Sequence, residues 1–471
     1  MANTIIVSGG LVTTGDASGN LFVFASGAGD KSTVIGGAGK DTIDLNSGES
    51  AVGGLDINLK GGQDTVDISA TELSGSTIKL GAGADTLTFT ANSGQLDSLY
   101  GGDGDDVVAI SGQIDVSLIN AGGGSDIISG SDAVSASGAA LQMGAGNDTI
   151  VLSAAEAASA TLLGGGGADS ITLDVGAAST AIKIAGDAAG TVGKDTITIQ
   201  NTAILVDEIN LQGAGGADVI KFDGSAGTIG STGKILGNYG GDSIDISALF
   251  AGAGGLTIGG GAGSDTITLD EFGSAGSGAF VIGGSGADSI SLVTNNAGTA
   301  GDATTSAGNG FGAIIGGAGA DSITFVGDVG ASVAAAGEIV ISSVSDSTED
   351  AMDVIRFTAG ATNAGLLFNL DMSDGVAGNA SDADKGLRFS AGIVASAGGT
   401  NFGDMISAVD ALVTTTGKAG TFAHSGDVYL FVQGGSTDML VRVDSQDTYS
   451  SDSIAFSAAV SGEFKLVLTS D

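Results

Sequence analysis

The chain has 471 residues and carries 54 acidic against 14 basic side chains, for a formal net charge of -40. Such a charge repels nucleic acid and anionic lipid surfaces, and it favours cations as partners. Cysteine and proline are both absent, which excludes a disulfide scaffold and a thiolate metal site and suits a fold whose backbone N–H groups are paired in ladders. Acidic chains with few aromatic residues are often disordered, but 42% of these residues are hydrophobic, which favours a folded protein.

Residues 1–35 contain two short apolar runs, Ile5-Ile6-Val7 and Leu21-Phe22-Val23-Phe24. We expect a first coil or cap that shields the end of the region that follows, or alternatively an exposed edge that pairs with a neighbouring molecule. The opening sequence has neither the basic start nor the apolar core of a cleaved signal peptide. No stretch approaches the roughly 18 apolar residues of a membrane span. The sequence therefore predicts no membrane insertion and either a cytoplasmic location or export without an N-terminal signal.

Residues 36–357 repeat one short motif, in which an aspartate follows glycines placed four and two residues earlier. The aspartates are Asp41, Asp64, Asp85, Asp106, Asp126, Asp148, Asp169, Asp195, Asp218, Asp242, Asp265, Asp288, Asp321 and, in a degenerate copy, Asp353. Successive aspartates are 20 to 26 residues apart, except for the last two intervals of 33 and 32. A fixed period of this length is the sequence signature of a solenoid.

Apolar residues alternate with polar ones on both sides of each turn, as in Ile57/Leu59 before Asp64 and Val66/Ile68 after it. A period of two indicates a strand with one buried face. We therefore predict an all-β, parallel β-solenoid in which each coil of about 22 residues consists of a strand, a glycine turn, a strand and a variable return. Outward positions are predicted for further aspartates, namely Asp44, Asp67, Asp174 and Asp245.

Stacking such coils about 4.8 Å apart brings the turn aspartates together on one edge. Repulsion between adjacent carboxylates is then about 0.9 kcal/mol in water and about 3.5 kcal/mol at an effective dielectric constant of 20. A divalent cation between turns replaces this repulsion with attraction. Calcium accepts both carboxylate oxygens and the carbonyl oxygens of a glycine turn as ligands. With a dissociation constant of about 10⁻⁴–10⁻³ M, millimolar calcium would stabilise each site by about 0.4–1.4 kcal/mol. We expect roughly ten or more Ca²⁺ ions in one row.

The predicted calcium ligands are the turn glycines and aspartates. They are Gly37, Gly39, Asp41, Asp64, Gly81, Gly83, Asp85, Gly102, Gly104, Asp106, Gly122, Gly124, Asp126, Gly144, Gly146, Asp148, Gly165, Gly167, Asp169, Asp195, Asp218, Asp242, Gly261, Gly263, Asp265, Gly284, Gly286, Asp288, Gly317, Gly319 and Asp321. The copies that end at Asp64, Asp195, Asp218 and Asp242 lack the earlier glycine, and the copy at Asp353 lacks both, which weakens the prediction there.

Six copies match the nonapeptide G-G-x-G-x-D-x-U-x: GGAGKDTID (36–44), GGDGDDVVA (101–109), GGGGADSIT (164–172), GGAGSDTIT (260–268), GGSGADSIS (283–291) and GGAGADSIT (316–324). Residues 36–357 thus resemble the RTX-type calcium-binding β-roll, and the resemblance implies calcium at the turns. RTX repeats usually follow one another every nine residues, whereas here one motif occurs per coil. We therefore expect one calcium row along one edge.

Residues 358–471 form the third predicted region. We expect a short amphipathic helix over 403–417, a hairpin over 420–445 and a final strand over 461–471, which makes a small, mostly-β C-terminal domain. FAHSGDVYLFVQ (422–433) is similar to the C-termini of RTX proteins exported by type I secretion. The resemblance implies an uncleaved C-terminal signal, the type I secretion apparatus as a partner and an extracellular or cell-surface location.

No motif for catalysis stands out. The single histidine, His424, lies in the predicted hairpin, and neither H-E-x-x-H nor a phosphate-binding G-x-x-x-x-G-K-[ST] occurs. Paired carboxylates such as Asp105/Asp106 could serve acid–base chemistry, but they lie inside the calcium-type repeat. We predict that the protein is not an enzyme.

The composition is similar to that of RTX-type bacterial surface-layer proteins. We predict a structural, self-assembling cell-surface protein, as a surface layer or an extracellular filament, that polymerises with itself and meets cell-surface polysaccharide. The alternative is a calcium-dependent adhesin or biofilm-matrix protein, with the insertions between Asp288 and Asp353 as recognition loops.

Overall fold

The computed structural model divides the chain into two compact units, residues 1–228 and 229–471. All elements that the structure describes are β-strands. The described residues are 3–7, 12–24, 31–45, 52–69, 73–90, 94–111, 115–130, 140–154, 160–175, 181–188, 191–200, 206–223, 227–246, 249–251, 256–269, 280–294, 313–319, 321–327, 339–342, 353–357, 366–371, 388–389, 418–424, 427–432, 439–444, 454–458 and 464–468.

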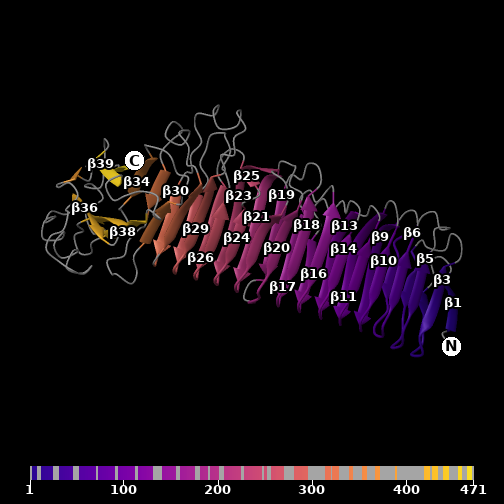
Figure 1. The fold of residues 1–471 in the computed structure, drawn as a ribbon. Helices are drawn as coiled ribbons and strands as arrows, with labels where there is room; N and C mark the ends of the chain where they lie inside the picture. The colour runs from indigo at the N-terminus through magenta and orange to yellow at the C-terminus, as the bar shows by residue number, and fades with distance from the viewer. Residues whose placement is uncertain are drawn as a thin grey trace. The chain divides into compact units, whose positions relative to one another are not determined.

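The first unit is a parallel β-solenoid in which the chain alternates between two sheets (Figure 1). Sheet A contains β1 (Asn3–Val7), β3 (Asn20–Phe24), β5 (Thr42–Leu45), β8 (Thr65–Ile68), β10 (Thr86–Phe89), β12 (Val107–Ile110), β14 (Ile127–Gly130), β16 (Thr149–Ala154), β18 (Ser170–Val175), β20 (Thr196–Gln200) and β22 (Val219–Asp223). Sheet B contains β2 (Val12–Thr14), β4 (Thr33–Ile35), β6 (Val52–Gly53), β7 (Asp56–Asn58), β9 (Leu73–Ala82), β11 (Gly94–Asp103), β13 (Asp115–Gly123), β15 (Ala140–Ala145), β17 (Ala160–Gly166), β19 (Ala181–Asp187) and β21 (Val206–Gly215). The predicted all-β solenoid is confirmed.

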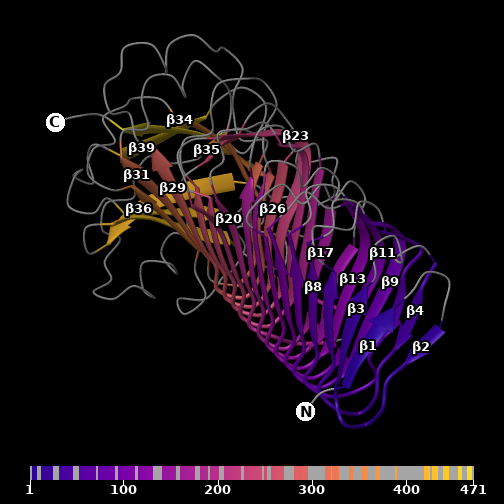
Figure 2. The ribbon, with the colours of Figure 1, turned by 90° about the vertical axis from the view of Figure 1, so that its right-hand side faces the viewer.

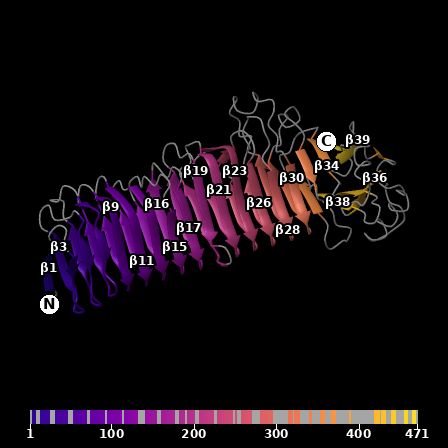
Figure 3. The same ribbon diagram turned by 180° about the vertical axis from the view of Figure 1, so that it is seen from behind.

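The second unit repeats this arrangement in its solenoid part. Its sheet A strands are β24 (Ser243–Ile246), β27 (Thr266–Leu269), β29 (Ser289–Thr294), β31 (Ser322–Gly327) and β33 (Asp353–Phe357). The opposite sheet contains β23 (Gly227–Tyr239), β26 (Leu256–Ala262), β28 (Phe280–Ser285), β30 (Ala313–Ala318), β32 (Ile339–Ser342) and β34 (Leu366–Asp371), and β25 (Leu249–Ala251) is a short further strand. Seen from behind, the strands of each unit again lie side by side (Figure 3).

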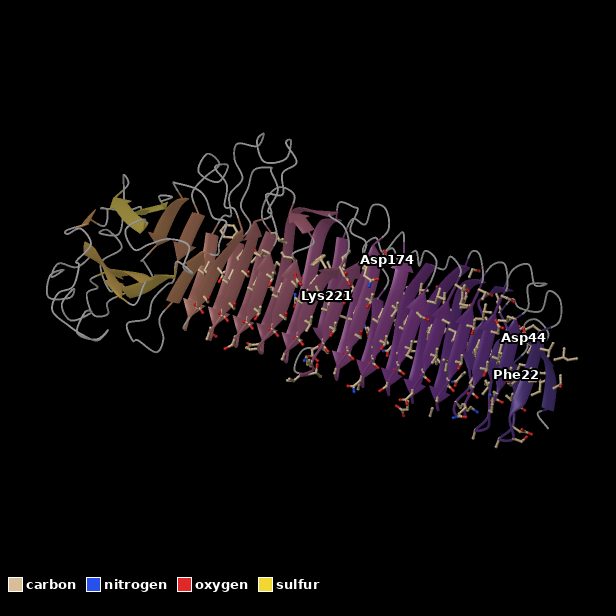
Figure 4. The ribbon with its side chains drawn as sticks, in the orientation of Figure 1. Phe22, Asp44, Asp174 and Lys221 are labelled. Carbon is tan, nitrogen blue, oxygen red and sulfur yellow. The ribbon has the colours of Figure 1, made fainter. Side chains whose placement is uncertain are left out.

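The core follows the predicted alternation. Ile43, Val66, Leu87 and Val108 occupy matching positions on four successive strands of sheet A, and all are buried. Phe22, labelled in Figure 4, fills the same position in β3. Since parallel strands in register bring equivalent residues together, one apolar pattern repeated along the chain makes a continuous core. No coil could bury its apolar face alone.

The C-terminal strands match the predicted hairpin and final strand. β36 (Lys418–His424) pairs with β37 (Asp427–Val432), and β37 pairs with β38 (Met439–Asp444), both antiparallel. β39 (Ile454–Ala458) pairs antiparallel with β40 (Phe464–Leu468), and the two-residue β35 (Arg388–Phe389) lies beside β36. The predicted helix over 403–417 lies outside the described residues, and domain limits at residues 35 and 357 stay a prediction. Within the described part of the chain, no helix is long and apolar enough to cross a membrane.

The turns stack so closely that the second motif glycine has no room for a side chain. Gly124 has a φ of 136°, in the region that favours glycine, and a Cβ atom there would overlap the carbonyl group of Gly104 in the preceding coil. Gly123, its neighbour, has no such φ, and a Cβ atom there would meet only Asp103 Oδ1 at 3.9 Å. The two adjacent glycines therefore differ sharply in what they tolerate.

We expect Gly124→Ala to lower the free energy of unfolding by about 2–4 kcal/mol, because strained backbone and steric overlap add. Gly123→Ala is the matched control and should change it by less than about 1 kcal/mol. Denaturant unfolding followed by circular dichroism measures both. Equal effects at the two positions would contradict the described packing of the turns.

Candidate metal site: the row of turn aspartates

The turn aspartates form a buried row in each unit. In the first unit, the Asp41 N–H donates a hydrogen bond to Asp64 Oδ1 at 2.7 Å, and the same bond, at 2.7–2.8 Å, joins each following pair as far as Asp195 and Asp218. In the second unit it joins Asp242, Asp265, Asp288 and Asp321 at 2.7–2.9 Å. All thirteen predicted aspartates are at most 3% exposed. Figure 2 shows the turns stacked along an edge of the first unit.

This row joins each turn to the next one. The aspartate N–H lies where the chain bends, and a buried backbone donor needs a partner. Oδ1 of the next coil supplies that partner, while the aspartate carbonyl accepts the N–H of the following coil, as between Asp41 O and the Thr65 N–H at 2.9 Å. One carboxylate oxygen per coil is therefore used in the stacking itself.

The second carboxylate oxygen, Oδ2, has a different environment. Nine of these atoms are buried and have no hydrogen-bond partner among the protein groups: those of Asp64, Asp85, Asp106, Asp126, Asp148, Asp169, Asp195, Asp265 and Asp288. Asp41 differs, because its Oδ2 accepts the Gly37 N–H at 2.7 Å. A buried carboxylate oxygen without a partner costs considerable free energy. The chain thus holds rows of oxygens that need a cation or a proton.

Burial is the main cause of raised pKa values along the row. It raises the pKa of Asp64, Asp106 and Asp195 to about 7, and that of Asp126, Asp148 and Asp288 to about 6. Hydrogen bonds from the preceding coil oppose the rise, and negative charges of neighbouring carboxylates add to it. Burial is also the main cause of the raised pKa values of Asp85, Asp169, Asp218 and Asp265.

Basic side chains compensate these nine carboxylates little: the charge of Lys40 lowers the pKa of Asp64, but burial raises it by more. A salt bridge joins Lys221 Nζ to Asp223 Oδ2 at 3.5 Å, on the outer surface and away from these nine carboxylates. No three Asp, Glu, His or Cys side chains anywhere in the described ranges converge into a group that could hold a metal ion. A cation in the row would therefore need main-chain carbonyl oxygens beside one or two carboxylates. An all-oxygen set of flexible geometry is what calcium accepts, so the residues fit this ion.

Three of the weaker motif copies keep the turn geometry. Where the earlier glycine is missing, Lys60, Ala214 and Asn238 adopt φ values of 71°, 85° and 77°. The glycines at the same place also have positive φ values, though larger ones, for example 116° at Gly81. The surrounding coils thus impose the turn on residues that disfavour it. Asp64, Asp218 and Asp242 consequently lie in the rows although their copies lack that glycine.

Asn20 is a member of the row that sequence reasoning missed. It lies one residue before the pair Leu21 and Thr42, opposite Asp41, and it is 1% exposed. Its backbone N–H and its Nδ2 both donate to Asp41 Oδ1 at 2.7 Å, and Nδ2 also lies 3.0 Å from Asp16 O. The row therefore begins with a neutral amide. The available signal was Gly19-Asn20 directly before an apolar run, 21 residues ahead of Asp41.

We expect Asn20→Asp to lower the free energy of unfolding by about 2–3 kcal/mol, because it replaces an amide donor with a second buried carboxylate beside Asp41. Asn147→Asp is the matched control. Asn147 is exposed and uses only its Oδ1, which accepts the Ala168 N–H at 2.8 Å, as Asp105 Oδ1 accepts the Ser125 N–H. Thermal unfolding of both variants tests this, and an unchanged Asn20→Asp protein would contradict the assigned hydrogen bonds.

Comparisons with known proteins add no relative: the sequence matches no protein-family model and no curated protein sequence. The resemblance to the RTX β-roll rests on the motifs and on the solenoid with its aspartate rows. The parallel β-solenoid is established by the structure, and the functions that the resemblance implies are proposals.

Proposed function

We propose that this protein is a structural, self-assembling cell-surface protein whose solenoid is completed by calcium outside the cell. The observation that carries the proposal is the set of nine buried Oδ2 atoms that have no protein partner. Calcium bound there would neutralise the repulsion between successive carboxylates. The turn glycines and aspartates would hold it, with carbonyl oxygens completing the set.

The buried polar chemistry of the described residues supports a structural role. Each row aspartate accepts a hydrogen bond from the neighbouring coil with Oδ1, so the repeated polar groups stabilise the stacking of the coils. Stability in such a fold grows with the number of stacked coils, because neighbours bury one another's apolar faces. A protein of this kind is suited to forming a coat or a fibre.

One uncharged face supports self-assembly of so acidic a chain. On β10, β12, β14, β16 and β18, the side chains one and three residues after the turn aspartate carry no charge. They are Thr86, Thr88, Val107, Ala109, Ile127, Ser129, Thr149, Val151, Ser170 and Thr172. Ile127 and Val151 are 43% and 42% exposed. Copies of a chain with a net charge of -40 repel one another least where charge is absent. Asp44 and Lys221, labelled in Figure 4, belong to sheet A strands on either side of this group.

Export completes the proposal. A chain that needs millimolar calcium to fold would stay unfolded in a calcium-poor cytoplasm and would fold after release. The C-terminal stretch around β36 and β37 would act as the type I secretion signal, and cell-surface polysaccharide would anchor the assembly. The insertions between Asp288 and Asp353, on which an adhesin function would depend, lie largely outside the described residues.

Negative-stain electron microscopy of purified protein tests the proposal. With 1–10 mM calcium we expect sheets or regular filaments, and after chelation we expect them to disperse. Monodisperse particles in both conditions would contradict self-assembly, and glycan binding by those particles would support an adhesin instead.

A further inference from the structure

The turn between β19 and β20 is larger than the others and contains an additional carboxylate. Asp187 ends β19 and pairs with Gly165, so it stands where the motif has its first glycine. The interval from Asp169 to Asp195 is 26 residues, and the extra residues follow Asp187. Asp187 is nevertheless only 4% exposed. A charged side chain has here replaced a glycine and is turned into the protein.

Both oxygens of Asp187 are buried, but only one has partners. Oδ2 accepts the N–H groups of Gly193 at 2.9 Å and Gly215 at 3.3 Å. Oδ1 has no hydrogen-bond partner among the protein groups. An unpartnered oxygen on a carboxylate that is more than nine-tenths buried indicates that something else binds there.

The enlarged turn is held in place around this carboxylate. The Ala188 N–H donates to Gly165 O at 2.6 Å, and the Thr191 hydroxyl lies 2.7 Å from both Gly165 O and Ala188 O, donating to one at a time. On the other side, the Gly193 N–H donates to Gly215 O at 2.8 Å. The turn is therefore fixed to the coils before and after it, which makes Asp187 part of a formed site.

Asp187 acts on the row through its charge. Burial is the main cause of the raised pKa values of Asp169, Asp195 and Asp218, and the charge of the Asp187 carboxylate adds to the rise in all three. Gly193 lies between the two carboxylates of its own turn: its N–H binds Asp187, and a Cβ atom on it would lie 3.0 Å from Asp195 Oδ1. Asp187 and Asp195 are thus two buried negative groups in one turn.

Among the described residues, no basic side chain forms a salt bridge with either carboxylate. Lys194 lies in the same turn but is exposed, and it forms no salt bridge with any described residue. Leaving two adjacent carboxylates buried and uncompensated is costly, whereas a doubly charged ion with oxygen ligands compensates both.

We propose that Asp187 and Asp195, with carbonyl oxygens of the enlarged turn, form a divalent-cation site that binds calcium more tightly than the other positions of the row. This inference rests on the proposed calcium row and adds one strong site within it. The physical reason is the ligand charge: this turn provides two buried carboxylates where a regular turn provides one, and calcium affinity rises with that number. Magnesium fits this site less well than calcium, because a carbonyl-rich, irregular site does not offer the octahedral geometry that magnesium requires.

Calcium titration calorimetry on the full chain at pH 7.5 tests the site. Wild type should show one ion bound at least tenfold more tightly than the rest. Asp187→Asn, which keeps the acceptor for Gly193 and Gly215, should lose that ion and keep the weaker ones. Asp174→Asn is the control, since Asp174 has an unpartnered Oδ1 on β18 but lies outside the row (Figure 4), and it should bind calcium as wild type does.

A second variant tests whether loss of the tight site in Asp187→Asn could result from misfolding. Replacing residues 187–193 by Gly-Ala-Gly restores the regular turn of the neighbouring coils, and it should also remove the tight site while circular dichroism stays that of the wild type. Uniform binding in the wild type, or a tight ion retained in both variants, would overturn the inference and leave the calcium row intact. A wild-type chain that binds no calcium would overturn the row and the inference together.

Discussion

The triple variant Asp106→Asn, Asp126→Asn, Asp148→Asn should be more stable than the wild type without calcium, and calcium should reduce that advantage. The three residues are consecutive in the row, and each has a buried Oδ2 without a protein partner. Asparagine keeps the Oδ1 acceptor for the preceding coil but removes the charge. Without calcium, relief from buried charge should raise the free energy of unfolding by roughly 1–3 kcal/mol per site. With millimolar calcium, the wild type gains about 0.4–1.4 kcal/mol of binding stabilisation at each site that the variant lacks, so the difference between the two proteins shrinks by that amount.

Chemical denaturation at pH 7.5, in chelator and in 5 mM calcium, measures how far calcium reduces the difference in stability. The matched control is Asp44→Asn, Asp67→Asn, Asp97→Asn, which removes three partly or fully exposed charges outside the row. It should show a small effect that calcium leaves unchanged, because only general repulsion changes. A row variant that is destabilised equally with and without calcium would show that its carboxylates serve packing alone.

Without calcium, the protein should lose stability as the pH rises from about 4 to 8. The folded-state pKa values of about 6 to 7 exceed the ordinary value of 3.8, because burial disfavours the charged carboxylate. Between these values the folded state binds more protons than the unfolded state, so the free energy of unfolding falls with rising pH. The stabilisation is complete below about pH 4 and is lost as the pH passes the folded pKa values. Most acid-sensitive proteins show the opposite slope.

Melting temperatures in calcium-free buffer at pH 5, 6, 7 and 8 measure this slope. The triple asparagine variant should show a flatter profile, because three of the titrating groups are gone. High salt separates the buried groups from general repulsion, since it screens exposed charges far more than buried ones. Stability that rises with pH across this window in the wild type would contradict the raised pKa values.

The sequence predicted the architecture well because the repeats share the same pattern of apolar residues, glycines and aspartate. Alternation of residues such as Ile43 and Leu45 fixes which face is buried, and the recurring turn fixes where the chain changes sheets. The row of aspartates follows directly, since equal coil lengths bring equal positions together. These properties depend on period and register, which can be inferred directly from the sequence.

The turn details could not be predicted in the same way. Lys60, Ala214 and Asn238 adopt positive φ because their neighbouring coils impose it. The conformational preferences of these residue types do not predict it. The hydrogen bond from each aspartate N–H to the next carboxylate depends on side-chain direction, which the period does not specify. Asp187 was missed because it replaces a glycine and therefore looks like a broken copy of the motif.

Equilibrium dialysis with elemental analysis of bound calcium tests the central idea most directly. At pH 7.5 and millimolar free calcium, the wild type should hold on the order of ten Ca²⁺ ions per chain, and the triple asparagine variant should hold fewer. Retention of at most one ion by the wild type, or the same count in both proteins, would contradict it.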